Sequence, residues 1–156
     1  MIKQIISGAQ TGADRAGLDF AIRYNISYTG YVPEGRRSED GTVPTKYILK
    51  EMDTASYFKR TEKNVIESDA TVILSRGELG GGSSYTREMA RKYNRPWLHL
   101  NLNILSIEEA SNRLKNWLEE KGIKRLNIAG SRESKDPKIY DLTMKILEGM
   151  WMSYEV

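Results

Sequence analysis

The sequence of 156 residues contains no cysteine and only one histidine, His99. The missing cysteines exclude disulfides, thiolate metal ligands and a cysteine nucleophile. A single histidine also excludes a zinc site built from several histidines. It lies in the apolar run Trp97–Leu100, where a histidine more often packs in the core than binds a ligand. We therefore expect no metal site.

Long hydrophobic runs are also missing. No apolar segment is long enough to span a bilayer, and the N-terminus lacks the charged-then-apolar pattern of a secretion signal. We therefore expect a cytoplasmic protein with no membrane partner. An excess of one charge is missing too, because the 24 basic and 21 acidic residues are interspersed and give a net charge of +3. Nucleic-acid-binding proteins normally carry a concentrated basic patch, so nucleic acid is not an expected partner.

What the sequence does contain is an alternation of strand-like and helix-like segments, at a length that fits one domain over residues 1–156. Apolar runs predict five strands, at residues 2–7, 28–32, 70–74, 96–100 and 125–129. Periodic apolar residues predict helices at 13–24, 46–52, 54–67 and 83–93, a helix from the capping box at Ser106 to Gly122, and a last helix from about Pro137. This alternation predicts an α/β fold with a mostly parallel sheet.

Glycines, hydroxyl groups and arginines follow four of these strands, at residues 8–15, 33–37, 75–86 and 130–135. Open α/β sheets bind ligands at the carboxyl ends of their strands, and a glycine loop that opens a helix directs backbone amides toward an anion, usually a phosphate. The long polar segment 34–45 is typical of a functional loop. The pattern predicts a composite anion site at this edge of the sheet.

The first loop offers Gly8, Gln10, Thr11, Gly12 and Asp14 as candidates. Its spacing matches neither the dinucleotide fingerprint nor the NTPase phosphate loop. Thr11 and Asp14 could bind a ligand, or they could form a capping box at the start of the first helix, and the sequence favours the two roles of Asp14 equally. Gln10 is not a favoured cap residue, so we expect it to contact a ligand.

The other loops supply further candidates. The run Gly80, Gly81 and Gly82 permits close approach to a ligand, and Ser83 and Thr86 offer hydroxyl donors. Arg36, Arg37 and Arg132 are suited to neutralising a phosphate, although Arg36 and Arg37 could instead pair with Glu39 and Asp40. Glu88 is a general acid/base candidate, and the helix dipole equally favours a glutamate there. The segment 60–65 resembles a solvated helix face.

Six segments of the chain form a set that occurs in this order: residues 10–14, 35–41, 60–65, 68–71, 81–86 and 130–135. Together they resemble the "putative molybdenum carrier" family, which is also described as a circularly permuted branch of the SLOG, lysine-decarboxylase-like Rossmannoid superfamily. The resemblance implies a Rossmann-like three-layer sandwich with helices on both faces, and a nucleotide or nucleotide-like ligand. It adds Glu39, Asp40 and Glu133 to the ligand-binding candidates, and it makes Arg60, Glu62 and Asn64 residues of the site or of a supporting network.

Two functions follow as hypotheses. The first is binding of a phosphate-bearing nucleotide, or carriage of the molybdenum cofactor, molybdopterin. The second is hydrolysis of the N-glycosidic bond of a nucleoside monophosphate, with Asp14 or Glu88 as the catalytic carboxylate. Single-stranded nucleic-acid binding is a weaker alternative, against which the small net charge counts. Met150, Trp151 and Met152 give the last helix more apolar surface than one face buries, so we expect a homo-oligomer.

Overall fold

The computed structural model describes residues 1–155, and its centre is one parallel five-stranded sheet. The strands lie in the order β2-β1-β9-β7-β8, and every neighbouring pair is parallel. Their bounds are β1 Gln4–Ile6, β2 Ser27–Thr29, β7 Ala70–Ser75, β8 Trp97–Asn101 and β9 Arg125–Gly130. The expectation of an α/β fold with a parallel sheet is confirmed.

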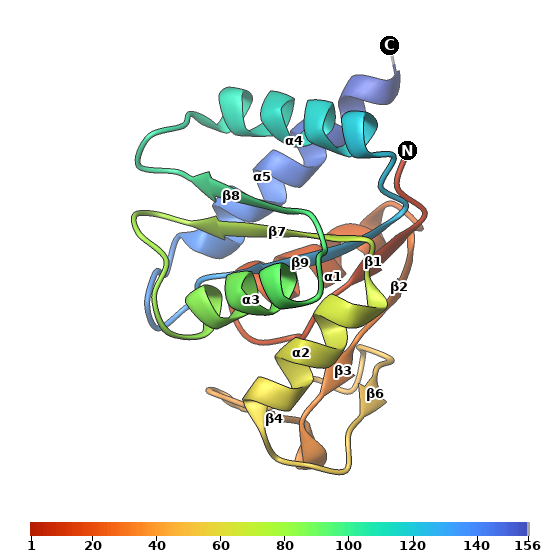
Figure 1. Ribbon diagram of the computed structural model, residues 1–156, viewed down its shortest axis with the longest axis vertical. Helices are drawn as coiled ribbons and strands as arrows, with labels where there is room; N and C mark the ends of the chain where they lie inside the picture. The colour runs from red at the N-terminus through yellow and green to blue at the C-terminus, as the bar shows by residue number, and fades with distance from the viewer. Residues whose placement is uncertain (156) are drawn as a thin grey trace.

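Helices cover both faces of this sheet, which makes three layers (Figure 1). Helices α1, α4 and α5 pack together on one face, and α2 and α3 pack together on the other. Their bounds are α1 Ala13–Arg23, α2 Tyr57–Glu67, α3 Gly81–Lys92, α4 Ile107–Lys121 and α5 Ile139–Met152, which the 3₁₀ turn η2 (Ser153–Glu155) follows. The Rossmann-like three-layer architecture implied by the family resemblance is therefore correct.

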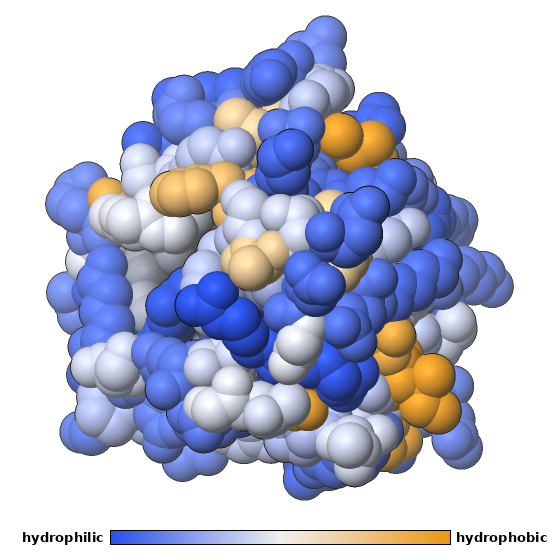
Figure 2. All heavy atoms as spheres, turned by 90° about the horizontal axis from the view of Figure 1, so that it is seen from below, coloured by the Kyte–Doolittle hydropathy of each residue, from blue (hydrophilic) through white to orange (hydrophobic). Residues whose placement is uncertain are grey.

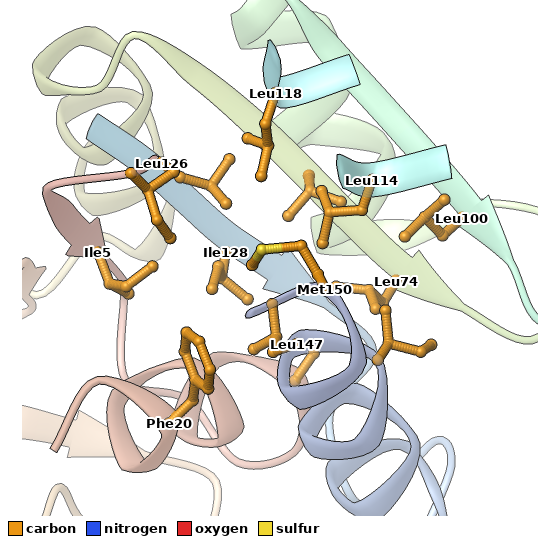
Figure 3. Packing of buried hydrophobic residues seen from close by; sticks show 14 of the residues in the cluster. Ile5, Phe20, Leu74, Leu100, Leu114, Leu118, Leu126, Ile128, Leu147 and Met150 are labelled. Carbon is orange, nitrogen blue, oxygen red and sulfur yellow. The ribbon is translucent and has the colours of Figure 1, made fainter. Parts of the chain in front are cut away.

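The main core lies between the sheet and the layer of α1, α4 and α5. Leu74 and Ile128 from the central strands meet Phe20 of α1 and Leu147 of α5 there, and all four side chains are fully buried (Figure 3). Strand β7 is buried along its whole length, as its apolar sequence predicts. This packing fixes the carboxyl ends of the central strands, where the loops begin.

The segment between β2 and α2 differs from the prediction. The expected strand 28–32 divides at Gly30 into β2 and β3 (Tyr31–Val32). A Cβ at Gly30 would lie 1.8 Å from the carbonyl oxygen of Ser7, the residue after β1, so a larger residue does not fit at this point. The expected helix at 46–52 is wrong: Lys50–Glu51 forms strand β6, which pairs with β3. Backbone pairing with an open strand edge outweighs the local helical pattern here.

The predicted polar loop 34–45 contains short regular elements. It contains a 3₁₀ turn, η1 (Glu34–Arg36), and a small hairpin of β4 (Arg37–Ser38) and β5 (Gly41–Thr42). Helix α2 begins later than residue 54, at Tyr57, because the Ser56 side chain caps it by accepting a hydrogen bond from the Lys59 amide.

Seen from below, the molecule presents a mostly hydrophilic face with a few small, separate hydrophobic patches (Figure 2).

Helix ends test the capping predictions. The Ser106 capping box of α4 is present, and Gly122 ends that helix in the left-handed conformation, with φ 62°. The capping box proposed for Thr11 and Asp14 is wrong, because Gly12 occupies the N-cap of α1 and no side chain caps it. The Thr11 hydroxyl instead donates to Glu39.

Candidate functional site

The loops that follow β1, β7 and β9 converge on one pocket, of about 350 Å³, and α2 closes it. The arrowheads of β7 and β8 in Figure 1 mark this edge of the sheet. Eight of the predicted ligand-binding residues line the pocket: Gln10, Asp14, Gly80, Gly81, Gly82, Ser83, Thr86 and Arg132. Its other walls are Arg60, Thr61, Ala129, Gly130, Ser131, Ser134 and Lys135.

A buried charge pair forms the floor of the pocket. The Arg60 guanidinium Nη1 lies 3.6 Å from Oδ2 of Asp14, and both side chains are about nine-tenths buried. Burial raises the pKa of the Asp14 carboxyl to about 6, although Arg60 and the Gln10 amide oppose this shift. Burial also lowers the pKa of the Arg60 guanidinium. Asp14 is therefore suited to exchanging a proton near neutral pH.

Arg60 reaches this position because Gly8 leaves room for it. A Cβ at Gly8 would lie 1.9 Å from Nη1 of Arg60. Gly8 therefore supports the pocket by being small, and it does not line it. The polar pattern of 60–65 did not distinguish Arg60 from a surface residue, and only the family resemblance singled it out.

Two buried polar atoms at the pocket lack a hydrogen-bond partner within the described residues. They are the amide oxygen Oε1 of Gln10 and the Nε of Arg60. The other end of the Gln10 side chain is fixed, because its Nε2 donates to the Arg37 carbonyl oxygen at 3.1 Å. Buried polar groups normally have partners, so these two atoms are an unused acceptor and an unused donor at the pocket.

Positive charge gathers beside the pocket around the ring of Tyr57. The guanidinium carbons of Arg37, Arg60 and Arg132 lie 5.6, 5.8 and 5.1 Å from the centre of this ring. Within residues 1–155, Arg37 and Arg132 form no ion pair, and Asp14 is the only carboxylate paired with Arg60. The cluster therefore favours an anion.

Helix α3 directs its N-terminus at the same space. Gly80 is its N-cap, and no side chain satisfies the first-turn amides. A Cβ at Gly81 or Gly82 would meet no atom within 4 Å, so the space beside these residues is open. The Thr86 hydroxyl donates to the Gly82 carbonyl oxygen at 2.9 Å, so it orders this turn.

The remaining predicted residues link loops instead of lining this pocket. The Arg36 guanidinium donates to the carbonyl oxygens of Val43, Pro44 and Tyr47. Asp40 pairs with Arg15 at 2.6 Å, so the alternative in which Arg36 or Arg37 pairs with Asp40 is wrong.

Glu39 binds Thr11 and Ser134, and these contacts join segments distant in the sequence. It accepts hydrogen bonds from the Thr11 hydroxyl and from the amide and hydroxyl of Ser134. Although partial burial opposes it, these bonds lower the pKa of the Glu39 carboxyl. Thr11 also accepts from the Glu133 amide at 3.1 Å. Thr11, Gly12 and Glu133 line a separate cavity, whose other walls include Tyr47 and Tyr140.

Three other candidates lie outside the pocket. Glu88 is exposed and pairs with Arg91 at 3.0 Å, and it lines an adjoining cavity. Asn64 binds both backbone groups of Tyr31, and Glu62 accepts from the Tyr93 hydroxyl. These two residues therefore form part of the supporting network. Within the described chain, no cluster of three or more histidines and carboxylates is placed to hold a metal ion.

Fold and pocket together define a Rossmann-like α/β protein with a pocket at the carboxyl edge of its sheet. Residues 5–151 match the circularly permutated YpsA SLOG family, and the chain belongs to this family. It is similar to a crystal structure described as "Putative molybdenum carrier protein" from Syntrophus aciditrophicus SB. The two share 53% identity over 96% of this chain and 94% of the other, with a TM-score of 0.94. A comparison with curated proteins finds no match.

Within the described residues, no helix is both long enough and apolar enough to cross a membrane.

Proposed function

We propose that the pocket binds a phosphate-bearing nucleotide or nucleotide-like ligand, and that molybdopterin is one such ligand. The observation that carries this proposal is the group of Arg37, Arg60 and Arg132 around Tyr57, beside the open N-terminus of α3. Guanidinium groups bind phosphate through paired hydrogen bonds, and helix N-termini attract anions. A phosphate here would meet both.

Each end of the ligand has distinct partners in this proposal. Arg132 and the amides of Gly81 and Gly82 bind the phosphate. The free Gln10 oxygen accepts a hydrogen bond from a hydroxyl or N–H group of the ligand, and the free Arg60 Nε donates one. The pocket volume lies within the usual range for small-molecule sites.

The carrier function is supported by the family and by the name given to the similar Syntrophus protein. The described residues provide no cluster of ligands for a metal ion. Molybdenum carried here would therefore be coordinated by the cofactor itself, while the protein binds its phosphate and ring.

The test is ligand retention and ligand-dependent stability. Native mass spectrometry of the purified protein should reveal a retained nucleotide or pterin, and a thermal-shift screen with both classes should raise the Tm. Arg132→Ala should abolish most of this increase, while Arg113→Ala, a change of an exposed arginine on α4, should preserve it. No stabilisation by any nucleotide or pterin would overturn the proposal.

Hydrolysis of an N-glycosidic bond is a second candidate, which the raised pKa of Asp14 favours. A carboxyl that titrates near pH 6 at a phosphate site is suited to activating water or stabilising a cationic transition state. Base release from a panel of nucleoside monophosphates tests this function. Asp14→Asn should abolish release, and Glu88→Gln tests the other carboxylate. Release unchanged in both variants would exclude these roles.

A cytoplasmic location and self-association complete the proposal. The absence of cysteine supports the first. Met152, which is 52% exposed near the end of α5, supports the second, although Trp151 packs within the chain against Phe20 and Tyr154. Light scattering at micromolar concentration should give a multiple of the 17.8 kDa chain mass.

A further inference from the structure

A second cavity, of about 560 Å³, adjoins the phosphate pocket and has a different lining. The two share Arg60, Thr61, Gly81, Gly82 and Arg132. The other walls of the second cavity are largely aromatic and come from Tyr57 and Phe58 at the start of α2 and Tyr85 of α3. A ligand with its phosphate in the first cavity therefore has an aromatic surface within reach.

The aromatic side chains are arranged as a binding surface. Phe58 is 61% exposed, although burial of a phenylalanine is normally favourable. Its ring meets that of Tyr85 edge to face, with centroids 4.7 Å apart and an interplanar angle of 72°. This contact holds two rings at the cavity without covering them, and open ring faces of this kind stack on planar heteroaromatic groups.

A carboxylate also lines this aromatic cavity. Glu88 lies one turn after Tyr85 on α3, and half of its side chain is exposed. Its carboxylate has two acceptor oxygens, and the contacts from Arg87 at 3.4 Å and Arg91 at 3.0 Å both go to Oε1. Two adjacent donors on a ring edge would suit it. Guanine and pterin carry a ring N–H beside an amino group, whereas adenine offers an amino group beside an unprotonated nitrogen.

We infer that this cavity binds the ring of the ligand, and that the ring belongs to the class with adjacent N–H and amino donors, as in guanine and pterin. The inference rests on the proposed function, because it requires the phosphate to lie in the first cavity. Phe58 stacks on the ring, Tyr85, whose plane is inclined by 72° to that of Phe58, packs against its side, and Glu88 accepts hydrogen bonds from its edge.

Titration calorimetry with four probes tests this inference: GMP, AMP, neopterin monophosphate and ribose 5-phosphate. Ribose 5-phosphate should bind weakly, and GMP or neopterin monophosphate should bind at least about tenfold more tightly than AMP. The tighter of these two identifies a nucleotide or a pterin as the source of the ring. Equal affinity for AMP and both other ring compounds would overturn the choice of ring.

Variants separate stacking from edge recognition. Phe58→Ala should weaken the preferred ring compound about tenfold and leave ribose 5-phosphate binding unchanged. Ile48 is 81% exposed and does not line the aromatic cavity, so Ile48→Ala should change neither the affinity for the ring compound nor that for ribose 5-phosphate. Glu88→Gln should reduce the preference over AMP about tenfold, while Glu108→Gln, an exposed glutamate of α4, should not.

The two proposals fail in different ways. If GMP binds and Phe58→Ala leaves its affinity unchanged, the ring site is wrong and the phosphate pocket stands. If none of the four compounds binds and no nucleotide or pterin in the thermal-shift screen stabilises the protein, the proposed function is overturned and the ring site with it.

Discussion

At the residue scale, the pocket depends on a small residue as much as on charged ones. Arg60 lies where a Gly8 side chain would lie, so the glycine determines where the guanidinium points. From the sequence, Gly8 is recognised as part of a tight loop. Its actual neighbour is 52 positions away, and no local pattern encodes a contact of that separation.

Gly8→Ala is expected to displace the Arg60 guanidinium. Since the new Cβ would lie 1.9 Å from Nη1, the substitution should cost about 1–3 kcal/mol of unfolding free energy and weaken ribose 5-phosphate binding. Urea denaturation measures the first effect and calorimetry the second. In an Arg60→Ala background the clash is gone, so the stability cost of Gly8→Ala should largely disappear. An equal cost in both backgrounds would contradict the argument.

The raised pKa of Asp14 makes stability depend on pH. The ordinary pKa of an aspartate is 3.8, and burial raises the pKa of Asp14 to about 6 in the folded protein. Between these values the folded chain retains a proton that the unfolded chain has released, so stability falls as pH rises from about 4 to about 6. The difference between these two pKa values corresponds to a loss of at most about 3 kcal/mol, and the value of about 6 already includes the opposing effect of Arg60.

Denaturation of the wild type and of Asp14→Asn across pH 4–7.5 measures this dependence. The variant lacks the titrating group, so its stability should increase relative to that of the wild type as the pH rises through this window. Parallel profiles for the two proteins would show that Asp14 keeps an ordinary pKa.

At the element scale, the features encoded locally could be predicted. The α4 capping box, the left-handed Gly122 and the buried strand β7 follow from residues close together in the sequence. The helix expected at 46–52 is wrong because strand β3 offers Lys50–Glu51 a partner that no local pattern reveals. Thr11 does not cap α1, because Glu39 and the Glu133 amide use its hydroxyl.

Gly82→Ala tests whether the glycine in α3 is needed for the fold or for close approach of a phosphate. Gly82 has no positive φ, and a Cβ there meets nothing within 4 Å. Alanine should therefore stabilise the fold by about 0.5–1 kcal/mol. If a phosphate rests on these amides, the same methyl group should weaken ribose 5-phosphate binding severalfold. Higher stability with unchanged affinity would place the phosphate elsewhere.

At the scale of the whole molecule, the carboxyl edge of the sheet could be predicted because parallel strands bring their following loops together. Which residues of those loops face the pocket could not. Arg36 is used by three backbone carbonyls, and Arg60 enters from α2, outside the strand-end loops. Both outcomes depend on how the segment between β2 and α2 folds against the sheet.

Glu39 connects that segment to the rest of the pocket, since it accepts hydrogen bonds from Thr11 and Ser134, 28 and 95 positions away. Glu39→Ala should destabilise the protein by only about 1 kcal/mol, because the side chain is largely exposed. Its main effect should be local. The Ser134 amide, which donates to Glu39 at 3.1 Å, should exchange its hydrogen at least about tenfold faster.

The Glu133 amide donates to Thr11, so it should also exchange its hydrogen faster if Glu39 positions Thr11. The buried turns of α5 should keep their protection against exchange. Glu34→Ala, an exposed glutamate at the start of the same segment, should leave both amides unchanged. Weaker ribose 5-phosphate binding in Glu39→Ala alone would show that the segment holds Arg37 and Arg132 in place. Unaltered exchange at Ser134 would mean that the segment and the pocket are ordered independently.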